Sequence, residues 1–356
     1  MRTAPHDDVA LGWCGPPEHG VPRLARQLAR AARDLGFSGP VVQEPDPAQV
    51  IDLAAGLPPA VRLLHLHVSD WLFADAGVGA DHAMAGLVRS LRDRGVALSV
   101  TLHDLPQPTD GPDLYQRRAA TYGAIVESVA GVVVCSEHER TLLDDALLAD
   151  GRRLPAAPDA VMVIPLPIDP AGPTPAGGPS AMTRTVGIFG YLYPGKGHRE
   201  VLDELASCQP AVDVLAIGRA SDRHRELVAD LTEVATGRGM SFRCTGYVPD
   251  SEVTARLRAP LIPVAPHTHV SASGSINSWI AAGRRPLVPS GRYASELGKR
   301  IPGSVHLYEP GQLRGAVEAA IDDPALTWLP PGTAVGPTTP AAAATYLAWL
   351  RARSDR

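Results

Sequence analysis

Cysteine is scarce and scattered in this sequence, which excludes a small disulfide-stapled scaffold. The four cysteines are Cys14, Cys135, Cys208 and Cys244, and no two of them form a C-x-x-C pair. A zinc knot is therefore not expected. Each cysteine adjoins apolar, strand-like residues, which predicts buried, reduced thiols and a cytoplasmic protein.

Long apolar runs and an excess of basic charge are also missing. No run of 18 apolar residues occurs, and no long apolar stretch follows Arg2, so we expect neither a transmembrane segment nor a signal peptide. Charged residues make up 20% of the chain and the net charge is −5. That balance argues against a nucleic-acid partner and against a polybasic membrane arm.

What the sequence does contain is a regular alternation of apolar strand patterns and amphipathic helix patterns. At 356 residues the chain is long enough for two domains. The predicted strands are 9–14, 61–68, 97–103, 131–135, 160–168, 185–190, 212–218, 241–246, 260–266 and 285–290. The predicted helices are 22–35, 80–94, 113–129, 136–148, 197–207, 222–236, 250–257, 275–282 and 340–354. Continuous apolar strands between helices indicate parallel sheets covered on both faces.

The alternation is interrupted once, in a segment rich in proline and glycine. "DPAGPTPAGGPSAMT" begins at Asp169 and contains four prolines, which is typical of a linker. We therefore predict an α/β protein with two doubly wound, Rossmann-like domains. The predicted parts are an N-terminal domain at 1–168, a linker at 169–184, a C-terminal domain at 185–335 and a final helical segment at 336–356. Ligands of such sheets bind at the carboxyl ends of the strands, so we expect the site in a cleft between the domains.

The stretch "VGIFGYLYPGKGH", from Val186 to His198, resembles a phosphate-binding P-loop but lacks one part of it. A P-loop requires Ser or Thr after Gly-Lys to bind magnesium, and Gly197 cannot do so. The segment still places Lys196 in a glycine-rich turn at the start of a helix. Backbone N–H groups, the helix dipole and the ammonium together favour an anion there. A solvated surface lysine is the alternative.

Metal and cofactor motifs are otherwise missing. "HLHVSD" places His65 and His67 on one face of a strand, but Ser69 stands where a zinc-binding Asp is needed. There is no D-x-D carboxylate pair, no G-x-S-x-G elbow and no G-x-G-x-x-G dinucleotide loop after the first strand. We therefore expect no bound metal and no cofactor.

Seven features in the same order along the chain resemble the family 4 retaining glycosyltransferases, which have the GT-B fold. The quoted stretches are "GWCGPPEHGVPRLARQLA", "LLHLHV" with "LSVTLHDLP", "GVVVCSE" with "VIPLPID", "GIFGYLYPGKGHREVL", "VLAIGRASDRHREL", "FRCTGYVPDSEV" and "PVAPHTHVSASGSINSWIAAGRRPLV". The resemblance implies transfer of a sugar from a nucleoside-diphosphate sugar to an acceptor, with retention and without metal. It implies an acceptor-side N-terminal domain, a donor-binding C-terminal domain, and a last helix that packs back on the N-terminal domain.

The resemblance also implies roles for individual residues. Departure of the diphosphate leaves negative charge, which Lys196 and the backbone N–H groups near Gly274 and Ser275 would stabilise. Arg219 is a candidate second cation, and Tyr247 with Val248 would hold the base. The complete implied donor site comprises Gly190, Lys196, Arg219, Tyr247, Val248, Gly274, Ser275, Asn277, Ser278 and Glu296.

On the acceptor side, the resemblance implies that His103, at the end of a strand, contacts the transferred sugar. His103 and Lys196 are thus the candidate catalytic residues. Asp104 would orient His103 or cap the next segment. His19 and Gly20 would lie at the acceptor entrance, where glycine permits close approach of the backbone.

Two departures from the family pattern bear on activity. Tyr191 stands where the family has an arginine ahead of the lysine. The family's Glu-x7-Glu pair is also missing: its second position falls on Ser278, and its first near Val270 or Ser271. Hydrogen bonds from Asn277 and Ser278 could replace the second carboxylate, or Glu296 could reach in.

These departures leave alternatives open. The chain could be a non-catalytic GT-B-like partner subunit, a sugar-nucleotide-binding protein, or a sugar-nucleotide epimerase or hydrolase. The base, the sugar, the acceptor and the choice between a monomer and a homo- or hetero-oligomer are not specified by the sequence.

Overall fold

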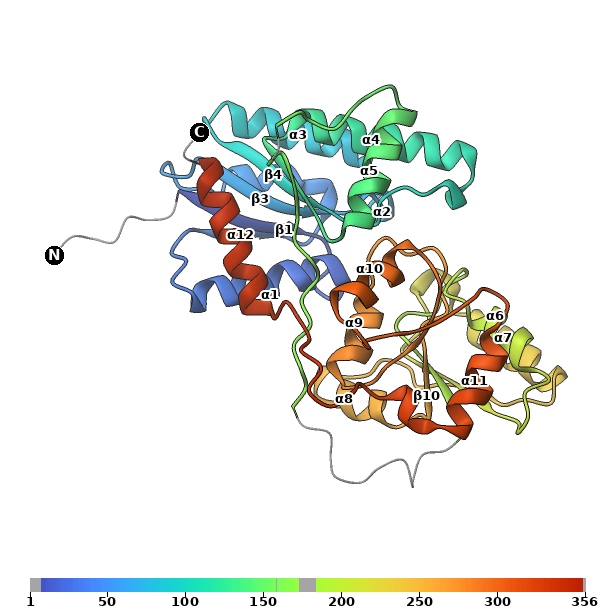
Figure 1. The fold of residues 1–356 in the computed structure, drawn as a ribbon. Coiled ribbons are helices and arrows are strands. Elements are labelled where there is room, and N and C mark those ends of the chain that lie inside the picture. Colours follow the sequence, from blue (N-terminus) through green and yellow to red (C-terminus); the bar gives the residue numbers. More distant parts are fainter. Residues whose placement is uncertain (1–7, 158, 173–183, 355–356) are drawn as a thin grey trace. The chain divides into compact units, whose positions relative to one another are not determined.

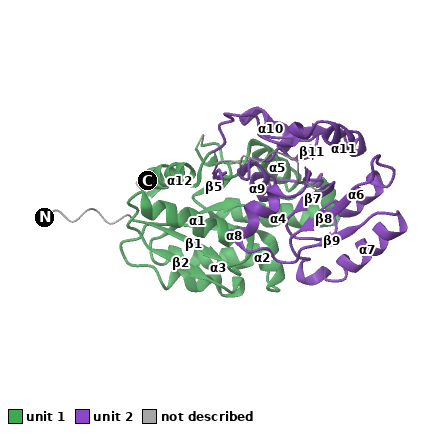
Figure 2. Ribbon diagram, turned by 90° about the horizontal axis from the view of Figure 1, so that it is seen from below, with its two compact units in different colours: residues 1–167, 337–356 green, residues 168–336 purple. Residues whose placement is uncertain are grey.

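Each half of the chain folds around its own parallel sheet (Figure 1). The computed structural model describes residues 8–157, 159–172 and 184–354, so most of the predicted linker lies outside the described residues. The chain divides into two compact units, Met1–Pro167 with Pro337–Arg356 and Ile168–Gly336 (Figure 2). Within the described residues, no helix has the length and apolar character that crossing a membrane requires.

The first unit contains a six-stranded sheet in the order β2-β1-β3-β4-β5-β6, with every neighbouring pair parallel. Its strands are β1 (Val9–Cys14), β2 (Val41–Glu44), β3 (Leu63–Val68), β4 (Ala97–Leu102), β5 (Gly131–Val134) and β6 (Val161–Val163). Its helices are α1 (Gly20–Asp34), η1 (Pro47–Ala54), α2 (Asp70–Asp75), α3 (Ala80–Arg92), η2 (Pro108–Asp110), α4 (Pro112–Ser128), α5 (Glu137–Ala149) and α12 (Thr339–Ser354).

Two apolar layers cover this sheet. Residues of η1, α3, α4 and α5 pack on one face, where Leu87 and Leu143 belong to the same buried cluster as Val100. On the other face α1 and α12 lie side by side, with Leu28 in the same buried cluster as Leu347 (Figure 1). The final helix of the chain therefore completes the core of the first unit.

The second unit contains a sheet in the order β12-β11-β10-β7-β8-β9, again entirely parallel. Its strands are β7 (Thr185–Phe189), β8 (Asp213–Ile217), β9 (Phe242–Cys244), β10 (Ile262–Val264), β11 (Leu287–Pro289) and β12 (His306–Tyr308). Its helices are α6 (His198–Leu205), η4 (Asp222–His224), α7 (Leu227–Gly237), α8 (Asp250–Arg258), α9 (Gly274–Ala281), α10 (Arg292–Arg300), α11 (Leu313–Asp322) and η5 (Pro324–Thr327).

Both sheets have a topological switch point, where the strand order reverses. It lies between β1 and β3 in the first unit and between β7 and β10 in the second. Doubly wound sheets bind ligands in the crevice outside the carboxyl ends of the strands at this point. The turns after these four strands are therefore where each unit is expected to hold a ligand.

The predicted alternation of strands and parallel sheets is confirmed, but one edge strand of each sheet was missed. Both β2 and β12 are edge strands with partly exposed residues, such as Gln43 and Leu307, so neither has a continuous buried apolar run. The helices α2, α10 and α11 were also not predicted. The single helix predicted at 222–236 is two, a 3₁₀ turn followed by α7.

One buried arginine ties several segments of the second unit together. Arg284 is fully buried, and its guanidinium donates hydrogen bonds to the carbonyl oxygens of Leu257, Arg258, Pro260, Leu261 and Thr327 and to the Thr327 hydroxyl. It also lies 4.2 Å from the Trp328 ring centroid. Carbonyl dipoles thus take the place of a carboxylate partner.

Replacing Arg284 with alanine removes all of these donors. We expect Arg284→Ala to lower the free energy of unfolding by about 3–5 kcal/mol, because the buried carbonyls lose their partners and a cavity forms. Arg292→Ala, on the exposed start of α10, is the control and should change it by less than about 0.5 kcal/mol. Urea denaturation measures both, and equal effects would contradict this role for Arg284.

Candidate functional site

The turn after β7 brings the second unit's main chain close to its neighbour strand. Gly190 has φ +116° and Gly218, after β8, has φ +146°. A Cβ atom on Gly218 would collide with the Gly190 carbonyl oxygen, so only glycine fits there. This close approach fixes the path of the chain leading to Lys196.

Lys196 is buried beside this turn. Only 6% of the residue is exposed, and its Nζ donates a hydrogen bond to Ser275 Oγ at 3.0 Å. A Cβ atom built on Gly190 would lie 3.5 Å from Nζ, which places the ammonium against the turn after β7. Within the described part of the chain Lys196 forms no ion pair with a carboxylate. Burial lowers the pKa of the ammonium to about 8.

The N-terminus of α9 meets Lys196 through a chain of hydroxyl groups. Ser273 caps the helix by accepting the Ile276 N–H at 3.2 Å, and its Oγ lies 3.1 Å from Ser275 Oγ. Nε2 of the buried His267 lies 3.1 Å from Ser273 Oγ. Gly274 is exposed, and a Cβ atom there would meet nothing within 4 Å. An ammonium and a helix N-terminus placed together favour an anion.

A second cation follows β8. The Arg219 guanidinium lies 5.4 Å from the ring centroid of Tyr191 and donates to Asp222 Oδ1 at 3.2 Å. Tyr191 stands where the sequence resemblance leads one to expect an arginine, so a positive charge does lie beside that position. Tyr247 is 66% exposed after β9, whereas Val248 packs on an apolar cluster with Trp279.

The expected substitutes for the missing carboxylates lie on two helices. Asn277 is buried on α9, and Ser278 donates its hydroxyl to the Gly274 carbonyl at 2.8 Å. Glu296 is half-buried on α10. Of the predicted donor-site residues, the structure brings Gly190, Lys196 and Ser275 together, through the contacts of the Lys196 Nζ described above.

In the first unit, His103 directly follows β4 and is buried beside His67. Its Nε2 lies 3.0 Å from Nδ1 of His67, and its Nδ1 lies 4.0 Å from the Cys135 sulfur. Burial lowers the pKa of His103 to about 4, against a smaller opposing effect of the Asp104 charge. His103 is therefore a neutral imidazole at physiological pH and can serve as a hydrogen-bonding group.

His19 and Asp104 lie near each other at the carboxyl edge of the same sheet. The His19 side chain accepts the Val21 N–H at 3.3 Å and caps α1 next to Gly20. Burial lowers the pKa of His19, while the charges of Asp104 and Asp75 act in the opposite direction. Asp104 accepts a hydrogen bond from the Ser69 hydroxyl at 2.7 Å.

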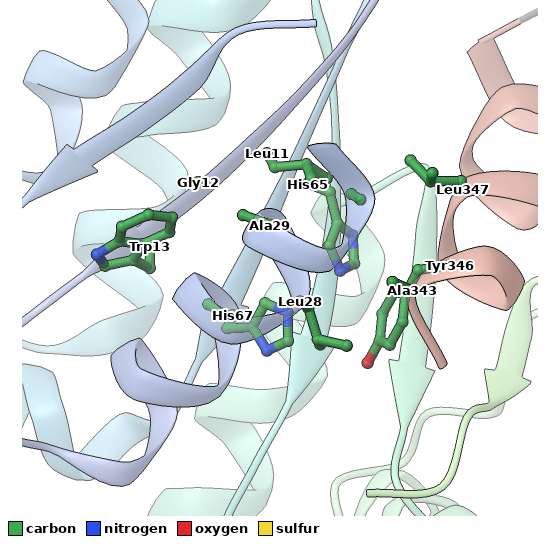
Figure 3. Close-up of a pocket in the computed structure, with 12 residues that line it drawn as sticks. Leu11, Gly12, Trp13, Leu28, Ala29, His65, His67, Ala343, Tyr346 and Leu347 are labelled. Carbon is green, nitrogen blue, oxygen red and sulfur yellow. The ribbon is translucent and has the colours of Figure 1, made fainter. Parts of the chain in front are cut away.

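The pair that resembled a zinc motif is engaged in hydrogen bonds instead. His65 lies 2.9 Å from Ser99 Oγ through Nδ1 and 2.9 Å from Thr101 Oγ1 through Nε2. His65 and His67 line one side of a small, mainly apolar cavity, opposite Tyr346 of α12 (Figure 3). Among the residues that the structure describes, no three His, Cys, Asp or Glu side chains are placed to hold a metal ion.

Two functional-site neighbours escaped the sequence analysis. Arg118 and Tyr122 of α4 contact the backbone carbonyls of Asp104 and His103, respectively. They lie four residues apart and so share a face of one helix. The only available signal was an Arg and a Tyr on the apolar face of the segment 113–129.

Comparison with known proteins found similar sequences and similar structures. A curated 2-deoxystreptamine glucosyltransferase from Streptomyces kanamyceticus is 27% identical over 297 residues, covering 77% of this chain and 73% of the relative. The structure of Anabaena Alr3699/HepE in complex with UDP-glucose has a TM-score of 0.68 and 16% identity and covers 98% of both chains. A glycosyltransferase from Rickettsia africae has a TM-score of 0.63 and 13% identity and covers 97% of this chain and 95% of its own. No protein-family model matches.

These similarities have different consequences for the sequence predictions. The solved structures confirm the expected GT-B fold, an α/β architecture with two Rossmann-like units. The curated relative supports the expected glycosyltransferase activity. Membership of family 4, retention and the individual residue roles stay predictions.

Substitution of two glycines near Lys196 should change the free energy of unfolding by very different amounts. Gly218→Ala forces a Cβ atom into the Gly190 carbonyl, so we expect it to lower the free energy of unfolding by more than about 2 kcal/mol. Gly274→Ala adds a methyl group to open space and should change it by less than about 0.5 kcal/mol. Chemical denaturation tests both, and a tolerated Gly218→Ala would contradict the close approach of the two turns.

Proposed function

We propose that this protein transfers a sugar from a UDP-sugar, glucose being the first candidate, to a small polar acceptor. The observation that carries the proposal is the buried Lys196 ammonium, which has no carboxylate partner within the described residues and lies against the N-terminus of α9. A buried charge needs compensation, and a diphosphate supplies it. The choice of UDP and glucose is supported by the relatives, one named a glucosyltransferase and one solved with UDP-glucose.

The proposed chemistry follows from where charge develops. As the bond between the anomeric carbon and the diphosphate oxygen breaks, negative charge builds on the diphosphate. Lys196, the backbone N–H groups of Gly274 and Ser275 and the Arg219 guanidinium would stabilise it, more strongly in a dry pocket than in water. Positive charges that belong to the protein would make a bridging metal unnecessary.

The sugar and the ribose would be held by neutral groups. The neutral His103 imidazole would hydrogen-bond a sugar hydroxyl, and Asn277 and Ser278 would take the place of the carboxylate that holds the ribose. Tyr247 and Val248 would contact the base. We propose retention of anomeric configuration and membership of family 4 on the sequence resemblance described above.

The acceptor that we propose carries an amine. The curated relative is named a 2-deoxystreptamine glucosyltransferase, and 2-deoxystreptamine is by its name an amine. In the first unit the charges of Asp104 and Asp75 act together on His19, at the proposed acceptor entrance. Carboxylates at that edge would attract an ammonium group and raise its local concentration.

Two other functions remain as alternatives, and one experiment separates them. The protein is incubated with a panel of nucleotide sugars, with and without an aminocyclitol, and released nucleotide and new glycoside are measured. A transferase releases UDP together with a glycoside. A non-catalytic sugar-nucleotide-binding protein binds UDP without turnover, and an epimerase converts the sugar without net nucleotide release; either result would overturn the proposal.

The chain has two lysines, which provides a matched pair of variants. Lys196→Ala should weaken UDP binding by about 10- to 150-fold, because a charge-assisted hydrogen bond contributes about 1.5–3 kcal/mol. Lys299→Ala, on the exposed side of α10, should leave affinity unchanged. Isothermal titration calorimetry measures both. Equal affinities of Lys196→Ala and the unmodified protein would show that the diphosphate binds elsewhere.

The lowered pKa of Lys196 predicts a pH dependence of UDP binding. The pKa of the Lys196 ammonium is about 8 in the free protein, and a bound diphosphate raises this pKa. The contribution of the ammonium to UDP affinity is therefore fully present only at a pH well below 8. Above about pH 8 the free lysine loses its proton, and affinity should fall by up to about tenfold per unit. Lys196→Arg keeps its charge and should bind with the same affinity from pH 7.5 to 9. A parallel decline in Lys196→Arg would assign the titration to another group.

A further inference from the structure

The turn at the end of β4 contains an unusual backbone conformation. Within the described residues, Asp104 alone has a positive φ without being glycine, at +52°. The left-handed region costs free energy for residues with a side chain and persists only where the surroundings hold it. Asp104 lies at the carboxyl edge of the sheet, next to His103. What holds this turn therefore also sets the positions of two proposed site residues.

Hydrogen bonds hold the turn from both sides. The Tyr122 hydroxyl donates to the His103 carbonyl at 2.5 Å, and Arg118 Nη2 donates to the Asp104 carbonyl. The Asp104 carboxylate accepts the Ser69 hydroxyl at 2.7 Å. Two successive carbonyl groups and the side chain between them are thus fixed by partners on α4 and after β3.

Arg118 is itself held by carboxylates. Its Nε and Nη2 donate to the two oxygens of Asp70 at 2.6 and 3.0 Å, and its Nη1 donates to Asp110 at 2.5 Å. Only 6% of Arg118 is exposed, and the guanidinium lies 4.9 Å from the Trp71 ring centroid. Only the planar fork of arginine can make two parallel bonds to Asp70 and still reach both other partners.

We propose that Arg118 and Tyr122 are positioning residues that hold the His103–Asp104 turn in the conformation required for sugar transfer. This inference rests on the proposed function, since the turn presents His103 to the sugar and Asp104 to the acceptor. Without the two donors, Asp104 relaxes to a negative φ and its carboxylate leaves Ser69. The change of φ at Asp104 also moves the backbone carbonyl of His103. Nucleotide binding in the second unit does not depend on the turn.

The test compares removal of single hydrogen-bonding groups within the first unit. Tyr122→Phe removes one hydroxyl, and Arg118→Lys keeps the charge but loses the fork. Tyr346→Phe is the matched control, because its buried hydroxyl contacts Thr101 rather than the turn. If Arg118→Lys fails to fold, Asp110→Asn is used in its place. This milder variant weakens the ion pair between Arg118 and Asp110. The measurements are kcat, the Kd for UDP, and the φ angle of Asp104 in crystal structures.

We expect Tyr122→Phe and Arg118→Lys to lower kcat by about 10- to 100-fold, as displacement of catalytic groups does, with Asp104 at negative φ. The Kd for UDP should stay within about twofold, and Tyr346→Phe should keep kcat within about twofold. Unchanged kcat in both variants, or reduced kcat with Asp104 still at positive φ, would overturn the inference. Absence of turnover in the unmodified protein would instead overturn the proposed function, and the inference with it.

Discussion

The constraint on which the candidate site depends is the desolvation of a single ammonium group. Lys196 is placed under the turn after β7, with one neutral hydroxyl as its hydrogen-bond partner. Transfer of a charge from water into a protein interior costs far more than one such bond returns. That cost is reflected in the pKa of the lysine, which burial lowers to about 8. The group lies at the switch point of the sheet, where doubly wound folds bind their ligands. A bound anion is proposed to offset the remaining cost.

The two units differ in the partners of their buried positive charges. In the second unit, Arg284 donates to carbonyl oxygens and Lys196 to the Ser275 hydroxyl. Within the described residues, neither positive charge is paired with a carboxylate. In the first unit, Arg118 forms ion pairs with Asp70 and Asp110, which neutralise its charge. The unit proposed to bind a diphosphate therefore keeps positive charge available. The unit proposed to bind an amine keeps carboxylates near its histidines.

Much of the fold could be predicted from the sequence because its central strands are continuous apolar runs. β1, β3 and β7 are buried along nearly their whole length, and such runs between helices specify a parallel sheet. β2 and β12 escaped because these short edge strands are partly exposed and contain polar residues. In the site, the glycines around Lys196 indicated a tight turn at the start of a helix, and the structure has Lys196 there beside Ser275; binding of an anion stays a prediction. Arg118 could not be found, since its role depends on Asp70 and Asp104, which are 48 and 14 residues away along the chain.

The central claim is that the Lys196 ammonium binds the diphosphate of a nucleotide. A crystal structure of the complex with UDP, grown without divalent cations, tests this most directly. The account predicts a diphosphate oxygen within hydrogen-bonding distance of Lys196 Nζ, close to the backbone N–H groups at the start of α9. A nucleotide bound elsewhere, with Lys196 still bonded only to Ser275, would contradict it.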